Sequence, residues 1–264
     1  MNHWFHLVKK EIRLGLPAFL IPVIAFIVAA GIAFYLGHRE GMGFDVLFIV
    51  AMMATGMQVF YLVYYLFYSL QAERKKLHIW LHNPMSARAL LSAKVVAGLV
   101  TMIATLFITG GTALIVLPHS KVFTFGYTWS LIFEAGSWGG IHLILIALSL
   151  GIGFIFLWMI FLYFTRFIGS FVSFLLTFVL FIVIASATEW FAKTKVYAAL
   201  TMWGEFKLDS MITSLNVSVD QTHAEVFSEM GDISLFFGTY VYETILAIII
   251  FLVSCWILDR KVEV

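Results

Sequence analysis

The sequence contains few charged residues. Only 12% of its 264 residues are charged, about half the share of about 25% found in an average soluble domain. Hydrophobic residues make up 62% of the chain, and the mean hydropathy is +1.00. A soluble fold has no interior large enough for that much apolar surface, so we predict that much of the surface faces lipid.

The sequence has a single cysteine and lacks two common motifs for binding nucleotides and metals. Cys255 is the single cysteine, which excludes an intrachain disulfide. The sequence has neither a phosphate-binding loop nor a His-Glu-x-x-His pair. His78 and His82 have the spacing of zinc ligands on a helix, but no third ligand follows nearby. We therefore predict that the chain is not an enzyme and binds no metal, cofactor or nucleic acid.

Six apolar stretches are long enough to cross a bilayer, since about 20 helical residues span a hydrocarbon core of about 30 Å. The sequence thus predicts an all-α polytopic membrane protein, with residues 1–264 forming one transmembrane domain. The fourth and fifth stretches are separated only by Arg166, so we expect a short link at 163–166. The predicted spans are 16–36, 46–70, 95–117, 141–164, 167–187 and 233–258.

The positions of the basic residues predict the orientation. Lysine and arginine near the ends of spans are enriched on the cytoplasmic side. A cytoplasmic N-terminus places most of the 16 Lys and Arg residues on that side. We therefore expect a multi-pass protein of the bacterial plasma membrane with both termini in the cytoplasm.

The first 15 residues have the pattern of an interfacial helix, with an apolar and a basic face. Such a helix lies among the lipid headgroups, so membrane lipid is a predicted partner. The apolar face carries Trp4, Phe5, Val8 and Ile12. The basic face carries His6, Lys9, Lys10 and Arg13.

The predicted cytoplasmic loop 71–94 is longer and more aromatic than a topological anchor requires. If its centre is helical, Leu77, Trp80 and Leu81 form an apolar patch at i, i+3 and i+4. Ser86 can then cap the next helix. The alternative is a plain positive-inside loop with its tryptophan at the interface. The central segment reads Glu73, Arg74, Lys75, Lys76, Leu77, His78, Ile79, Trp80, Leu81, His82, Asn83, Pro84.

Residues 188–232 form the predicted outer segment, which is too small for an independent enzyme domain. Its first part is rich in aromatic residues and suits the outer leaflet, and we expect a polar loop at 216–231. Within the spans, polar side chains often mark cavities. Gln58 and Glu243 are therefore candidate cavity residues, although Glu243 also suits an interfacial position.

The order of these parts resembles the permease subunit of bacterial type-2 ABC exporters, including the antimicrobial and phenol-soluble-modulin peptide exporters. The most specific similarity is to their coupling-helix region. It is carried by residues 73–84 and then by Leu90, Leu91, Ser92, Ala93 and Lys94.

This resemblance implies that a separate cytoplasmic ATPase subunit holds ATP and Mg. It also implies a second permease, which is the same or a similar chain. The two permeases would form the path for a peptide or hydrophobic cargo. Trp80 and Leu81 would enter a groove on the ATPase. Charge pairs would orient the docking, and they would involve Glu73, Arg74, Lys75 and Lys76. The residues implied in coupling also include Leu77, His78 and Asn83.

A different class of function fits the same sequence. A membrane immunity or sensor protein would bind a ligand through the outer segment without ATP. The two hypotheses differ in whether the loop 71–94 contacts an ATPase.

Overall fold

The structure is a computed structural model that describes residues 3–74, 85–120, 129–219 and 224–261. Within these ranges, the side chains of residues 131, 208–233 and 261 are not described. The predicted coupling residues Lys75, Lys76, Leu77, His78, Trp80, Leu81 and Asn83 lie outside the described residues.

The described chain contains 6 helical stretches that are long and apolar enough to cross a membrane, which confirms the predicted all-α polytopic fold. The second stretch is continuous from α3 through η1 to α4. These stretches are α2 (Leu16–Arg39), α3 (Gly43–Met57) with η1 (Gln58–Phe60) and α4 (Tyr61–Arg74), α6 (Ala87–Val116) with η2 (Leu117–His119), α7 (Trp129–Ile168), α8 (Ser170–Ala192) and α10 (Phe237–Lys261).

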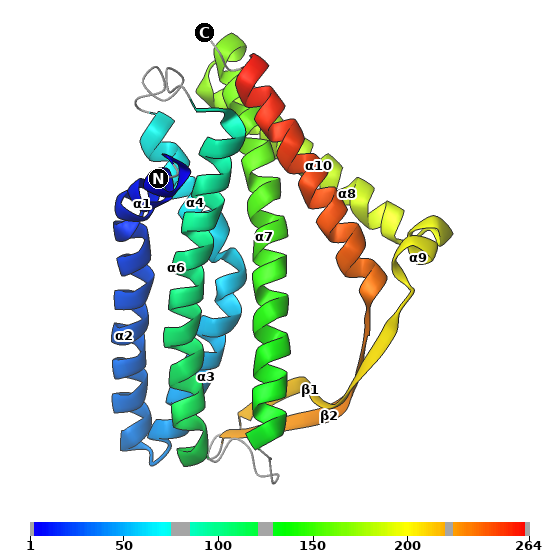
Figure 1. Cartoon of the computed structure of the whole chain (residues 1–264). Coiled ribbons are helices and arrows are strands. Elements are labelled where there is room, and N and C mark those ends of the chain that lie inside the picture. The colour runs from blue at the N-terminus through cyan, green and yellow to red at the C-terminus, as the bar shows by residue number, and fades with distance from the viewer. Residues whose placement is uncertain (1–2, 75–84, 121–128, 220–223, 262–264) are drawn as a thin grey trace.

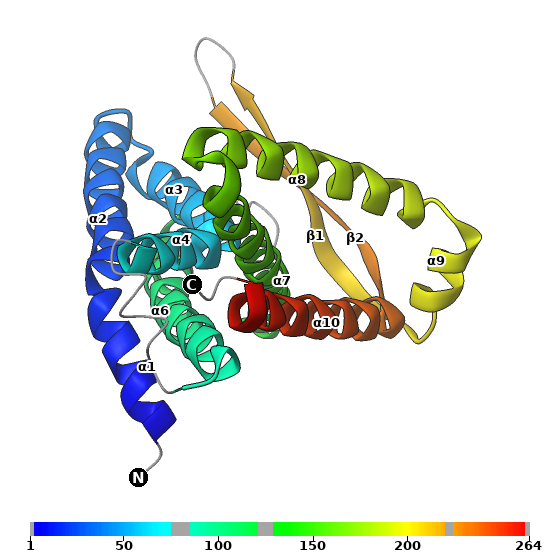
Figure 2. The ribbon, with the colours of Figure 1, turned by 90° about the horizontal axis from the view of Figure 1, so that it is seen from above.

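The elements have a clear polarity along the bundle (Figure 1). Helix α1 (His3–Leu14), the last turn of α4, the first turn of α6 and the last turn of α10 lie toward one end. A hairpin of two strands lies toward the opposite end. Seen from above, α8, α9 (Lys195–Thr201) and α10 lie on one side of α7, whereas α1, α2, α4 and α6 lie on the other (Figure 2).

Helix α4 lies at the centre of the packed core, between α6 and α7. Leu62 is fully buried and fits between two glycines, Gly98 of α6 and Gly151 of α7. A Cβ atom at Gly98 would lie 2.6 Å from Cδ1 of Leu62, and one at Gly151 would lie 2.7 Å from its Cδ2. Small residues at these positions allow the close helix contact that stabilises membrane bundles.

The link between the fourth and fifth spans is not at 163–166, as predicted, but at Gly169. Residues 163–166 continue α7, which ends at Ile168, and Arg166 lies in its last turn, where a cation interacts favourably with the helix dipole. Gly169 has a φ of 77°, a conformation that glycine adopts without a Cβ clash. Helix α7 also begins earlier than predicted, at Trp129 rather than at residue 141.

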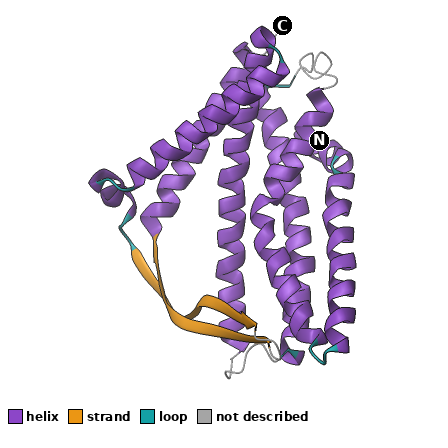
Figure 3. Ribbon diagram, turned by 180° about the vertical axis from the view of Figure 1, so that it is seen from behind, coloured by secondary structure: helices purple, strands orange, loops and turns teal. Residues whose placement is uncertain are grey.

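The predicted polar loop at 216–231 is wrong, because this region forms an antiparallel hairpin (Figure 3). Strand β1 (Glu205–Val219) pairs with β2 (Ala224–Phe236), from Glu205 opposite Phe236 to Val219 opposite Ala224. Because β2 continues to Phe236, the sixth span begins at Phe237 rather than at residue 233. The hairpin crosses the end of the bundle beside α7 (Figures 1 and 3).

The short helix α9 connects this hairpin to α8. Thr194 caps α9, since its Oγ1 accepts a hydrogen bond of 3.2 Å from the backbone N–H of Tyr197. Rings from three helices, those of Phe191, Tyr197 and Tyr242, then pack together, with 5.5 Å between the centroids of the two tyrosines. This contact ties the ends of α8 and α9 to α10.

Gly151→Val tests the contact around Leu62. The added methyl groups would enter the space of the Leu62 side chain, and we expect the free energy of unfolding in detergent to fall by about 1–3 kcal/mol. Gly153→Val on the same helix is the matched control, since nothing lies within 4 Å of a Cβ there. Equal thermal stability of the two variants would contradict this packing.

Candidate functional site

The N-terminal helix that the sequence predicts is present as α1, and it is packed against the bundle. Val8 is buried, Trp4 and Ile12 pack against the core, and Phe5 is 64% exposed. The indole Nε1 of Trp4 donates a hydrogen bond of 3.2 Å to Oγ of Ser92 on α6. The predicted basic residues, His6, Lys9, Lys10 and Arg13, are all exposed. One face of α1 is therefore fixed to α6, while its basic face is exposed.

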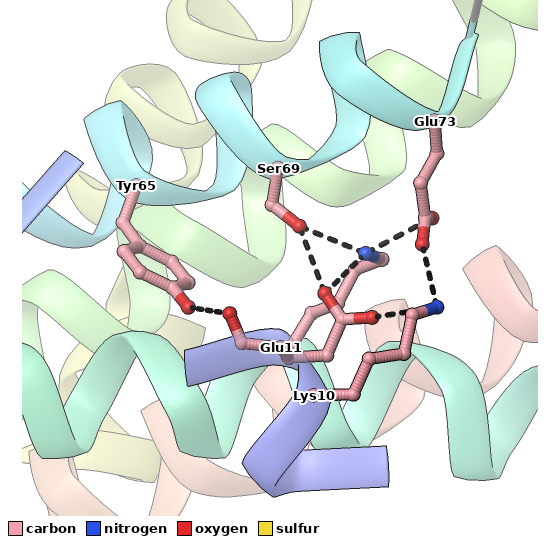
Figure 4. A network of polar contacts seen from close by, with 6 residues as sticks. Lys10, Glu11, Tyr65, Ser69 and Glu73 are labelled. Atoms are coloured by element: carbon pink, nitrogen blue, oxygen red, sulfur yellow. Dashed lines mark hydrogen bonds and ion pairs between the residues drawn. The ribbon is translucent and has the colours of Figure 1, made fainter. Parts of the chain in front are cut away.

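A buried cluster of charged side chains joins α1, α4 and α6 (Figure 4). Lys94 of α6 is 1% exposed. Its ammonium Nζ lies 2.7 Å from Oε2 of Glu11 on α1 and 2.9 Å from Oε2 of Glu73 on α4. The same ammonium donates a hydrogen bond of 2.8 Å to Oγ of Ser69, and that hydroxyl donates one of 3.1 Å to Glu11.

A second cation lies at the rim of this cluster. Lys10 is exposed, and its Nζ lies 3.7 Å from Oε1 of Glu11 and 3.9 Å from Oε1 of Glu73. Two carboxylates therefore face two ammonium groups, and the charges balance. A buried charge costs several kcal/mol unless it is paired and hydrogen-bonded. The three segments must therefore remain together for the cluster to be stable.

The turn from α1 into α2 is fixed by the same part of α4. The hydroxyl of Tyr65, which is fully buried, donates a hydrogen bond of 3.0 Å to the backbone carbonyl of Glu11. The ring of Tyr65 occupies the space that a Cβ at Gly15 would need. A glycine is required at this position because the ring lies directly against the backbone of the turn.

The first turn of α6 is bound to α10 as well. Ser86 caps α6 as predicted, its Oγ accepting a hydrogen bond of 3.4 Å from the N–H of Ala89. The backbone N–H of Ala87, also in this first turn, donates a hydrogen bond of 3.2 Å to Oδ1 of Asp259 near the end of α10. The helix that follows segment 75–84 thus begins in contact with the last turn of α10.

Two residues of the predicted coupling segment are described, and both have partners within the chain. Glu73 contributes its carboxylate to the buried cluster. Arg74 donates a hydrogen bond of 2.8 Å from Nη2 to Oγ of Ser170, and its guanidinium lies 4.9 Å from the centre of the Phe161 ring. The last turn of α4, which leads into segment 75–84, is thus fixed to α6, α7 and α8.

The two candidate cavity residues differ in their surroundings. Gln58 is buried, and its Oε1 accepts a hydrogen bond of 3.0 Å from Oγ1 of Thr105, so it joins α6 to the second span. Glu243 is exposed and lines a groove of about 250 Å³ between α7 and α10.

Sequence reasoning missed Glu11 and Ser69, and it identified Lys94 only through the family resemblance. The available signal was an acidic side chain among the basic residues of an amphipathic helix. In the part of the chain that the structure describes, no three His, Cys, Asp or Glu side chains come together as a metal site would require.

No protein-family model, curated protein or solved structure matches this chain.

Lys94→Met tests the cluster. The two carboxylates would lose their buried partner, and we expect the free energy of unfolding to fall by about 3–5 kcal/mol. We also expect a cysteine placed at the buried position Val8, in a Cys255→Ser background, to react faster with a maleimide as α1 separates. Lys9→Met, which removes an exposed charge from α1, is the control. Unchanged stability and labelling in Lys94→Met would refute the conclusion that this cluster holds α1 against the bundle.

Proposed function

We propose that this chain is the membrane-spanning permease subunit of an ATP-driven exporter of the ABC type, with ATP hydrolysed by a separate cytoplasmic subunit. Segment 75–84 would receive the ATPase, and a second permease would complete the path for a peptide or hydrophobic cargo. The resemblance of residues 73–84 and 90–94 to the coupling region of such permeases suggests this class.

The observation that carries the proposal is the anchoring of both ends of this segment. Glu73 and Arg74, just before it, are bound to α6, α8 and α7. Ala87, just after it, is bound to α10. A plain loop that only marks topology needs no such anchors. A segment that receives force needs such anchors, because a loosely attached segment would move by itself and leave the helices in place.

The cluster around Lys94 supplies a path for that displacement. A push on the end of α4 moves Glu73, which is paired with Lys94 of α6, and Lys94 is paired with Glu11 of α1. Tyr65 and the turn at Gly15 extend the path to α2. Four helices would thus respond to one docking event, as a permease driven by an external motor requires.

The surface of α8 supports an assembly with lipid or with a second permease. Ser173 is buried in this helix. The large apolar side chains of α8 point outward, as shown by exposures of 74% for Phe171, 59% for Phe174 and 52% for Phe178. An apolar helix with so little burial within its own chain needs apolar surroundings.

The double variant Trp80→Asp/Leu81→Asp tests the docking segment. Two carboxylates in an apolar anchor would prevent its burial in the ATPase. We expect vanadate-sensitive ATP hydrolysis, measured on tagged chain purified from its own membranes, to fall by about tenfold or more relative to the wild type.

The control for this experiment is Lys195→Asp/Lys207→Asp. Both residues are exposed and already charged, and they lie on α9 and β1, away from the anchored end of α4. This variant should retain the hydrolysis. Equal hydrolysis in both double variants, or none in the wild type, would contradict the proposal and favour a sensor that uses no ATP.

The orientation is tested separately by cysteine labelling in a Cys255→Ser background. Lys76→Cys should react with a membrane-impermeant maleimide only after the cells are opened, because the proposal places it in the cytoplasm. Lys195→Cys, at the start of α9, should react in intact cells. Reaction of Lys76→Cys from outside the cell would exclude a cytoplasmic ATPase as its partner.

A further inference from the structure

The groove between α7 and α10 combines an apolar wall with one carboxylate. Its volume is about 250 Å³, and it extends along α10 from Tyr240 to Leu252, a distance of about 18 Å at 1.5 Å per helical residue. The two helices run in the same direction (Figure 1). Positions along the groove can therefore be compared directly on its two walls.

Polar groups gather toward the start of α10. The hydroxyl of Tyr240 lies 3.3 Å from Nδ1 of His142 on α7. Glu243 and Thr244 follow one turn later and line the groove with Ser149. This part of the groove offers a carboxylate, three hydroxyls and an aromatic ring.

The remainder of the groove is apolar. Its walls are formed by Leu148 and Ile152 of α7 and by Ile248, Phe251 and Leu252 of α10. The groove therefore changes along its length from a polar, negatively charged end to an apolar end. Such a gradient matches a molecule with a charged head and an apolar tail.

Glu243 is exposed to the groove, and it lies within the length of the sixth span rather than at its end. It comes six residues after the start of α10, about 9 Å along the helix. Since Tyr240 lies beside His142 and the two helices run in the same direction, Glu243 is about level with Leu145 of the 40-residue helix α7. Among the described residues, no basic side chain forms an ion pair with Glu243 within 4.0 Å. An ionised carboxylate within a membrane span is costly without a cation, even beside hydroxyl groups.

We propose that this groove binds a cationic amphiphile, whose ammonium group pairs with Glu243 and whose apolar chain lies along Ile248 and Leu252. The ring of Tyr240 adds a cation–π surface for the head group. Charge complementarity favours a cation over a neutral lipid, and the length of the groove accommodates an alkyl chain of about ten carbons. As a cargo site the groove rests on the proposed function, but as a binding site it belongs to this chain alone.

Binding of tritiated decyltrimethylammonium to the purified full-length chain in phosphatidylcholine nanodiscs tests the proposal, with empty nanodiscs subtracted. The wild type should bind saturably, and Glu243→Gln should lower the affinity by about tenfold, as expected for loss of a partly desolvated ion pair. Ala247→Phe, which fills the groove, should abolish binding.

Glu134→Gln is the matched control, since Glu134 is an exposed carboxylate on α7 that does not line the groove. It should bind like the wild type. Decyl sulfate, with the same chain and the opposite charge, should not compete.

Equal affinity of Glu243→Gln and the wild type, effective competition by decyl sulfate, or no saturable binding would each overturn the proposal. The assay contains no nucleotide or ATPase, so its failure is distinguishable from failure of the proposed function.

Discussion

The ammonium group of Lys94 holds one end of this bundle together. It is almost completely buried, and the side chains that neutralise it come from two other helices, Glu11 from α1 and Glu73 from α4. Removing one partner leaves a buried charge, which is far less favourable than an apolar contact of the same size. The cluster therefore fixes which helices meet, whereas interchangeable apolar residues elsewhere in a membrane bundle do not.

Close packing around α4 extends the effect of the Lys94 ion pairs from one end of the bundle to the helices along it. Tyr65, Leu62 and Leu66 have no exposed surface, and glycines on the neighbouring segments leave room for them. A helix packed this closely moves as a unit, because its side chains have no free space into which to rearrange. Displacement at the Glu73 end of α4 is therefore passed to its neighbours.

The lengths of the apolar stretches predicted the membrane spans, and apolar periodicity predicted the amphipathic character of α1, because both are local properties of the sequence. It could not predict the charge cluster, since the pairing of Glu11 with Lys94 joins residues 83 positions apart. The link at Gly169 was predictable from a glycine between two apolar runs. The hairpin also had a local signal, as Leu215, Val217 and Val219 alternate with Asn216 and Ser218, the period of a strand.

The two sites can be connected mechanically through α10. Its last turns are held, with Cys255 and Leu258 buried and Asp259 accepting the N–H of Ala87. Its first turns are held as well, since the Tyr242 ring packs against Phe191 and Tyr197. A helix held at both ends passes a displacement of one end along its axis. If the proposed ATPase docks at the α6 start, its displacement would therefore reach the wall of the groove that carries Glu243, and the motor and the binding site would be linked without a contact between them.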